Sequence, residues 1–292
     1  MKDYRIGGHI VSIALNCPGT IEELLPNFTP FEYNGGEESV LTVIVADDIQ
    51  WDEGLTEIGC FDVGGSNHEV FRTSDGGYLF NIYDTRGHLC CRMQASPDFG
   101  NCHATLYPGT HLQRNYGLNN CLMMAYAFAT ATMDTILIHS SVIRCNGKGY
   151  LMTAPSGTGK STHTYMWHTA IPGCDLMNDD NPIIRMLDNK AIVYGSPWSG
   201  KTPCYRNIQA PIGGIVRIKQ QPENAIRRLG TIEAFTMLLP ACSNMKWDAR
   251  VYKGVCDSIT KFIQTCSIWE LGCLPNTEAA ILCHDTICEE SD

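Results

Sequence analysis

The clearest chemical pattern in the chain is the segment from Ala154 to Ser161, which reads Ala-Pro-Ser-Gly-Thr-Gly-Lys-Ser. Gly157 and Gly159 allow the backbone to turn through positive φ, so that consecutive N–H groups can converge on phosphate oxygens. Lys160 can then reach β- and γ-phosphates, and the Ser161 hydroxyl can ligate Mg²⁺. The first position is Ala154, where the strict Walker pattern has glycine. The alternative interpretation is a plain glycine-rich turn.

Two adjacent carboxylates follow this loop at Asp179 and Asp180, within the run Asn-Asp-Asp-Asn-Pro. The short, partly apolar run before them is typical of a strand that ends at the pair. One carboxylate can hold Mg²⁺, directly or through water, while its neighbour accepts a proton from an attacking hydroxyl. The same residues also form turns well, so a solvated turn is the alternative. Their position after the phosphate loop favours the catalytic interpretation.

His139 lies in a strand-like run, residues 135–144, that precedes the loop. A second run, 148–154, follows Asn146 and Gly147, and Asn-Gly between two such runs is the strongest short signal for a β-hairpin. We therefore expect His139 on the strand beside the one that leads into the phosphate loop. A histidine on an apolar strand can instead be a core residue, and the sequence does not fix its height along the hairpin.

The elements that must position these residues are predicted from hydrophobic periodicity. Residues 1–115 consist of short runs separated by turn residues, which predicts a β-rich subdomain built as an antiparallel meander. A helix is expected to open near Lys160, and Thr231 is expected to cap another. The domain that carries the phosphate loop is predicted at 116–292. Its other elements are strands at 186–195 and 213–220 and helices at 119–133, 231–241 and 247–266.

Composition limits the classes of function. The 292 residues are 44% hydrophobic and 18% charged, which suits a sizeable core and excludes a mainly disordered chain. The 21 basic and 31 acidic residues give a net charge of −10, which argues against a nucleic-acid partner. No window holds the roughly 18 continuous apolar residues of a bilayer span, so no membrane partner is expected.

Cysteine is unusually frequent, with 15 residues in the chain. The first residues lack the continuous apolar run of a signal peptide, which indicates a cytoplasmic protein with reduced thiols. No Cys-x-x-Cys spacing occurs, so a structural zinc site is not expected. The cysteines are predicted to be small buried hydrophobes and surface thiols.

The order of motifs over residues 138–162, followed by the aspartate pair, resembles the HPr kinase/phosphorylase and phosphoenolpyruvate carboxykinase superfamily. Its members share a hairpin that leads to the phosphate loop, a histidine on the first hairpin strand and an Asp-Asp pair. The resemblance covers about residues 117–285. It implies an α/β fold of the α+β, mixed-sheet type, in which a P-loop kinase domain follows a smaller β-rich N-terminal domain.

The resemblance also implies roles at the metal and the acceptor. Asp179 and Ser161 would bind the Mg²⁺ that accompanies the nucleotide, and Asp180 would be the third residue at the metal. Asp180, beside His139, would also face the acceptor as the general base.

Further roles concern the phosphates. Arg228 would contact the γ-phosphate, with Arg227 as the less favoured choice. Lys201 would contact phosphate or substrate, or else be a turn lysine. The ATP phosphates would be held by Ala154, Pro155, Ser156, Gly157, Thr158, Gly159, Lys160, Ser161 and Thr162.

The function predicted from these residues is an ATP- and Mg²⁺-dependent kinase that transfers the γ-phosphoryl group to a hydroxyl, with serine favoured. The acceptor belongs to a protein, a peptide or a small molecule, and homo-oligomerisation is left open. One alternative is a nucleotide-binding regulatory module without turnover. The other is a carboxykinase-like enzyme acting on an oxo-acid. It ranks last, because the helix before the histidine strand has no lysine for a second metal site.

Overall fold

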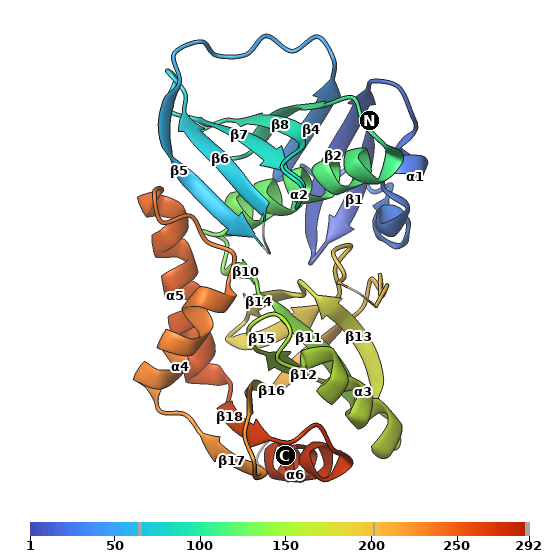
Figure 1. Ribbon diagram of the computed structural model, residues 1–292, viewed down its shortest axis with the longest axis vertical. Helices are drawn as coiled ribbons and strands as arrows, with labels where there is room; N and C mark the ends of the chain where they lie inside the picture. The colour runs from blue at the N-terminus through green and yellow to red at the C-terminus, as the bar shows by residue number, and fades with distance from the viewer. Residues whose placement is uncertain (64–65, 201, 290–292) are drawn as a thin grey trace. The chain divides into compact units, whose positions relative to one another are not determined.

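The computed structural model describes residues 1–63, 66–200 and 202–289 and has few helices. It divides into two compact units, Met1–Thr130 and Ala131–Asp292, and each contains a sheet of mixed strand direction (Figure 1). The fold is therefore of the mixed α/β type. Within the described residues, no helix is both long enough and apolar enough to cross a bilayer.

The sheet of the first unit has the strand order β3-β1-β2-β4-β9-β8-β7-β6-β5. From β5 to β9 each strand pairs antiparallel with the next, which confirms the predicted meander for this part. The pairs β2–β4 and β4–β9 are parallel and were not predicted. The strands are β1 (Lys2–Ile6), β2 (His9–Asn16), β3 (Glu32–Tyr33), β4 (Leu41–Ala46), β5 (Thr56–Val63), β6 (Ser66–Arg72), β7 (Tyr78–Tyr83), β8 (Leu89–Ala95) and β9 (Asn101–Leu106).

The long helix α2 (His111–Thr130) runs across one face of this sheet (Figure 1). Its Tyr126 hydroxyl donates to the carbonyl of Ile6 at 2.9 Å, and its apolar residues are buried around most of its circumference. The domain boundary predicted at residues 115–116 thus falls inside α2, because the apolar surface of this helix packs on the first sheet. The unit also contains α1 (Ile21–Leu24) and a 3₁₀ helix (Pro26–Phe31).

The sheet of the second unit has the order β10-β14-β15-β16-β12-β11-β13, and β18 pairs with both β16 and β17. Strands β12, β16 and β18 are parallel to one another. The strands are β10 (Thr135–Leu137), β11 (Ser140–Cys145), β12 (Lys148–Thr153), β13 (Asp175–Asp180), β14 (Ile183–Leu187), β15 (Lys190–Tyr194), β16 (Gln209–Gln220), β17 (Ala225–Arg228) and β18 (Ile268–Cys273).

The hairpin before the phosphate loop is confirmed, with one correction. Asn146 and Gly147 have φ of 49° and 78°, as a two-residue hairpin turn between β11 and β12 requires. The predicted first strand, however, is broken at His139. The segment before the break, β10, pairs with β14, whereas β11 pairs with β12 and β13. His139 therefore lies immediately before β11 rather than within a strand.

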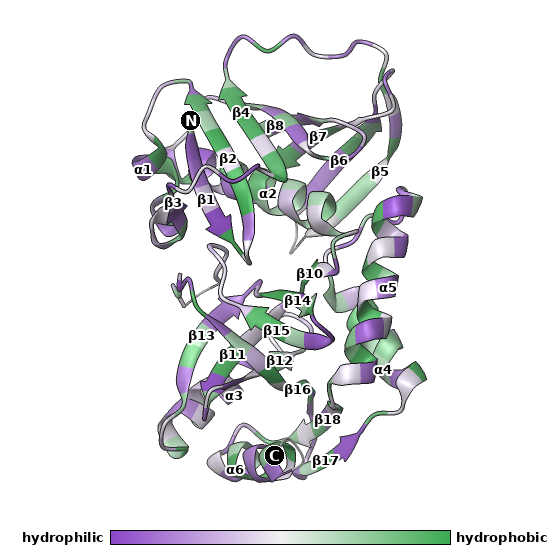
Figure 2. Ribbon diagram, turned by 180° about the vertical axis from the view of Figure 1, so that it is seen from behind, coloured by the Kyte–Doolittle hydropathy of each residue, from purple (hydrophilic) through white to green (hydrophobic). Residues whose placement is uncertain are grey.

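The helices of the second unit are α3 (Lys160–Ala170), α4 (Thr231–Leu238), α5 (Ala249–Thr265) and α6 (Thr277–Glu289), with a 3₁₀ turn at Leu239–Ala241. Helix α3 begins at Lys160 as predicted, and its Trp167 packs on Tyr150 with ring centroids 5.4 Å apart. In α5 the buried residues recur every three or four positions from Val251 to Phe262, and polar residues lie between them (Figure 2). Gly230, not Thr231, caps α4, since its N–H donates to the Glu233 side chain.

The structure corrects the expectation that all cysteines are reduced. Cys145 and Cys174 form a disulfide between the end of β11 and the residue before β13. The register pairs Arg144 with Asp175, so the two cysteines face each other at the next position along the ladder. The pairing is not predictable from the sequence, because the two cysteines are 29 residues apart and match no spacing motif. The other cysteines form no disulfide among the described residues and are mostly buried, and burial raises the pKa of the Cys266 thiol to about 11.

Candidate functional site

The phosphate loop connects the end of β12 to the start of α3. Gly157 and Gly159 have φ of 79° and 118°, and a Cβ at either would meet no described atom within 4 Å. Backbone conformation, rather than space, therefore requires glycine at both positions. The first N–H groups of α3 have no acceptor within the helix, and the helix dipole is positive at this end. The loop thus offers donors and positive potential to an anion.

Lys160, the first residue of α3, turns its mostly buried side chain back over the loop. Its Nζ donates to the carbonyl of Ala154 at 2.9 Å and lies 2.9 Å from Nε2 of His139. Burial lowers the pKa of Lys160, and the nearby carboxylates of Asp180 and Asp179 oppose this shift. The structure therefore brings the predicted lysine, histidine and aspartates into one cluster.

The backbone of His139 is fixed on both sides. Its N–H donates to the carbonyl of Ala241 at 2.7 Å, and its carbonyl accepts from the Thr153 hydroxyl at 3.1 Å. The ring Nδ1 lies 3.0 Å from Oδ1 of Asp180. These partners assign the proton to Nδ1, which donates to Asp180, and leave Nε2 to accept from Lys160.

Asp179 is buried, and both of its carboxylate oxygens accept hydrogen bonds. Its Oδ1 accepts from the hydroxyls of Ser141 at 2.5 Å and Ser161 at 3.1 Å, and its Oδ2 accepts from the N–H of Thr202 at 3.3 Å. Ser141 faces Asp179 directly across the β11–β13 ladder. Neither contact is predicted from the sequence, because strand pairing brings Ser141 to the carboxylate, and Thr202 reaches it from outside any strand.

Asp180 is the last residue of β13 and has a φ of 138°, a region that residues other than glycine rarely adopt. Such strained residues cluster at functional sites. Its side chain is 32% exposed, and Oδ2 accepts from the Asn181 amide at 2.8 Å. The strand end predicted for the aspartate pair is confirmed. The two carboxylates differ, since Asp179 is buried and Asp180 is accessible.

The donor set fits a magnesium–nucleotide complex. The Ser161 hydroxyl, at the start of α3, and the Asp179 carboxylate, at the end of β13, offer oxygen ligands to a metal and lie 3.1 Å apart. Mg²⁺ is typically held by one or two carboxylates together with substrate phosphates and water. Among the described residues, no group of three or more His, Cys, Asp and Glu side chains is arranged to hold a metal.

One row of cross-strand partners passes through this site. Asp180 pairs with Ser140, Ser140 with Thr153, Thr153 with Arg217 and Arg217 with Glu270. Neighbouring partners in a sheet lie about 4.8 Å apart. Arg217 is therefore one strand from the last residue of β12, where the loop begins. Arg217 was not predicted as a site residue, because it lies far along the chain from the loop and in no motif.

The two arginines predicted to contact phosphate lie farther from the loop than Lys160 does. Arg228 is on β17, which β18 and β16 separate from β12, so its contact with a γ-phosphate stays a prediction. Arg227 on the same strand pairs with Glu270 at 3.1 Å. Thr162 is exposed on the first turn of α3. Lys201 lies outside the described residues.

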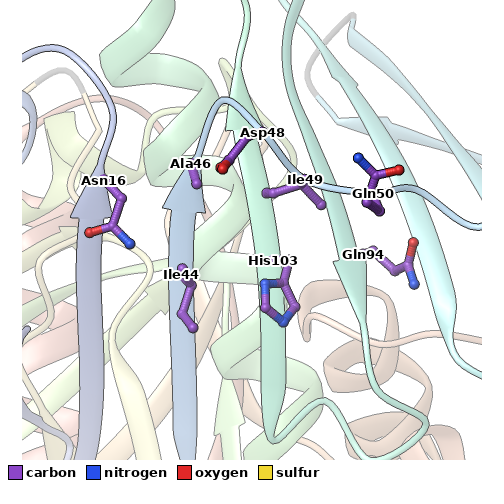
Figure 3. A pocket seen from close by; sticks show the side chains of 8 residues that line it. All are labelled: Asn16, Ile44, Ala46, Asp48, Ile49, Gln50, Gln94 and His103. Atoms are coloured by element: carbon purple, nitrogen blue, oxygen red, sulfur yellow. The ribbon is translucent and has the colours of Figure 1, made fainter.

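The first unit has a cavity of its own, of about 350 Å³. Figure 3 shows Ile44, His103 and Gln94 on neighbouring strands and Asp48 on the segment that follows β4. The lining is mixed: carboxylate, amide and imidazole groups lie beside aliphatic ones. Its lining includes neither a glycine-rich loop nor a lysine or arginine side chain.

Comparison with known proteins gives a weak link at the level of the fold. No family model matches the chain, and no curated protein matches it. Among solved structures, the HPr(Ser) kinase/phosphatase from Coxiella burnetii aligns with 53% of this chain and 95% of its own, at 11% identity and a TM-score of 0.32. At that identity and TM-score no residue's role transfers from one protein to the other.

Proposed function

We propose that this chain is an ATP- and Mg²⁺-dependent kinase that transfers the γ-phosphoryl group to a hydroxyl, with serine as the favoured acceptor group. The observation that carries the proposal is the chain of contacts Lys160–His139–Asp180 beside the pair Ser161–Asp179. It combines a cation for phosphate, oxygen ligands for Mg²⁺ and an accessible base within one cluster. These are the parts that phosphoryl transfer needs, because catalysis there is mainly positioning and charge neutralisation.

Each group has a separate task in this proposal. The N–H groups of the loop and Lys160 hold the phosphates, while Ser161 and Asp179 hold Mg²⁺. Bound Mg²⁺ would neutralise charge on the phosphate oxygens. Ser141 orients Asp179 by donating to the same oxygen as Ser161, which leaves that carboxylate with one fixed direction.

Asp180 accepts the proton of the attacking hydroxyl as the new O–P bond forms and the bond from the γ-phosphorus to ADP breaks. His139 and Asn181 each occupy one of its oxygens with a single hydrogen bond, so a lone pair remains for the acceptor. The strained backbone of Asp180 supports this role, because the position is held against its own conformational preference.

The proposal is tested by nucleotide binding and transfer. We expect the protein to bind Mg-ATP in calorimetry, to lose most of that affinity in EDTA, and to transfer labelled phosphate to one of a panel of serine-containing acceptors. Asp179→Asn should lower transfer about 100-fold or more, whereas Asp188→Asn, a matched change in the β14–β15 turn, should not. A protein that binds no ATP contradicts the proposal. ATP binding with no ADP formation and no transfer supports a regulatory module instead.

A further inference from the structure

A second cavity, of about 380 Å³, lies in the second unit beside β16, β17 and β18. Lys219, Arg227 and Glu270 are among the residues that line it. Its volume is within the range of small-molecule sites. It shares no residue with the phosphate loop.

The cavity and the loop lie at the same edge of the sheet. Strands β12, β16 and β18 are parallel, so their carboxyl ends meet there, and ligands of open α/β sheets bind outside such ends. β16 continues beyond Arg217, the partner of the last residue of β12, as far as Gln220. There the Gln220 amide donates to the carbonyl of Thr158 in the loop at 3.2 Å. Gln220, which contacts the loop, lies between the cavity-lining residues Lys219 and Gln221 in the chain, and its side chain points to the other face of the sheet from that of Lys219.

The direction of a bound nucleotide follows from the proposed function, on which this step rests. The phosphate to be transferred must lie near Asp180 on β13, which is reached from β12 across β11. The cavity lies on the opposite side of β12, beyond β16. The other end of the nucleotide therefore points toward Glu270, two strand spacings or about 10 Å from Thr153.

The chemistry of the wall suits a sugar. The Glu270 side chain is only 14% exposed and accepts from Lys219 at 2.6 Å and Arg227 at 3.1 Å. Burial tends to raise the pKa of Glu270, but its bonds to the two cations lower it overall, so the carboxylate is ionised. The cations are balanced by Glu270 and Glu223 of the same wall, and a wall without net charge suits a neutral nucleoside better than a further phosphate.

We propose that this cavity binds the ribose of the nucleoside triphosphate, with the Glu270 carboxylate accepting hydrogen bonds from the 2′- and 3′-hydroxyls. A carboxylate has two oxygens and can accept from both hydroxyls of one sugar. Lys219 and Arg227 hold the carboxylate in place, so the contact is made by a group that is already oriented.

The test compares ATP with inorganic tripolyphosphate, which has the phosphates without the sugar, by calorimetry in Mg²⁺. Glu270→Gln should weaken ATP binding about tenfold and leave tripolyphosphate binding unchanged or tighter, because two cations lose a carboxylate partner. Glu233→Gln is the matched control. Glu233 also pairs with Arg227, at 2.9 Å, but is exposed on α4 and does not line the cavity. Its loss also frees Arg227, so it should leave the ratio of the ATP and tripolyphosphate affinities unchanged.

A second test changes the ligand and not the protein, so its result does not depend on whether a variant folds. The wild-type protein should bind 2′,3′-dideoxy-ATP about tenfold more weakly than ATP, and Glu270→Gln should weaken this analogue no further. Equal affinity of the wild-type protein for ATP and the dideoxy analogue overturns the ribose site while the kinase proposal stands. Failure of both ATP and tripolyphosphate to bind contradicts the kinase proposal, and the ribose site with it.

Discussion

The ammonium nitrogen of Lys160 lies 2.9 Å from Nε2 of His139, and the other ring nitrogen lies 3.0 Å from Asp180. One imidazole thus joins the cation of the phosphate loop to the accessible carboxylate. Because a neutral imidazole has one donor and one acceptor, both contacts are satisfied by a single tautomer. In the proposed reaction His139 is therefore a positioning residue, which would act through its two neighbours.

Replacing His139 by alanine should lower kcat about 10- to 100-fold while the KM for ATP changes little, since Lys160 keeps its contact with the Ala154 carbonyl. Steady-state kinetics with Mg-ATP would measure the two parameters separately. His88→Ala, at an exposed histidine of the first unit, serves as the control. A large rise in KM with kcat unchanged would mean that the imidazole serves binding instead.

Gly157→Ala should weaken ATP binding about tenfold. Gly173→Ala is the control, because the two glycines have φ of 79° and 80° and both face open space among the described residues. Alanine costs about 1 kcal/mol of stability at either position, so thermal unfolding should shift equally. Only the change at Gly157 alters the direction of N–H groups in the phosphate loop. Equal ATP affinities of the two variants would contradict a phosphate-binding role for the loop.

Stability should fall as the pH falls from 6.5 toward 4. Burial lowers the pKa of His163 on α3 to about 4, and its Nε2 accepts from Trp167 at 3.1 Å. In that interval the unfolded chain binds the proton and the folded chain does not, so protonation favours unfolding. The difference is about 2 kcal/mol between pH 7 and pH 5 for this group. In urea unfolding, the free energy of unfolding of His163→Gln should depend less on pH than that of the wild-type protein. An unchanged dependence between pH 7 and pH 5 would contradict its assignment to His163.

Arg217 and Arg228 are competing candidates for contact with the triphosphate. The sheet register places Arg217 one strand from the end of β12 and Arg228 three strands away. We expect Arg217→Gln to lower kcat/KM for Mg-ATP about 100-fold and Arg228→Gln to lower it less than threefold. The reverse order would support the role that the family resemblance implies for Arg228.

The sequence predicted those parts of the site that are local in the chain. The hairpin turn at Asn146, the start of α3 at Lys160 and the strand end at Asp180 all follow from short-range signals of turn and helix chemistry. These signals depend on only a few neighbouring residues, so the sequence is enough to predict them.

The missed features depend on strand pairing between distant segments. Ser141 contacts Asp179, Arg217 lies beside Thr153 and Cys145 meets Cys174 only once β11, β13, β12 and β16 have paired. A change of one residue in register would turn each of these side chains to the other face of the sheet. Periodicity within one segment carries no such information, and the break at His139 likewise arises because β10 and β11 have different partners.

The most direct measurement is phosphoryl transfer by Asp180→Asn compared with the wild-type protein, alongside calorimetry of Mg-ATP binding. Asparagine keeps the size and can still accept a hydrogen bond from His139, but it cannot take the hydroxyl proton. We predict ATP affinity within about threefold of wild type and transfer lowered by about 10²- to 10⁴-fold. Transfer at the wild-type rate by Asp180→Asn would contradict the proposal that Asp180 is the general base.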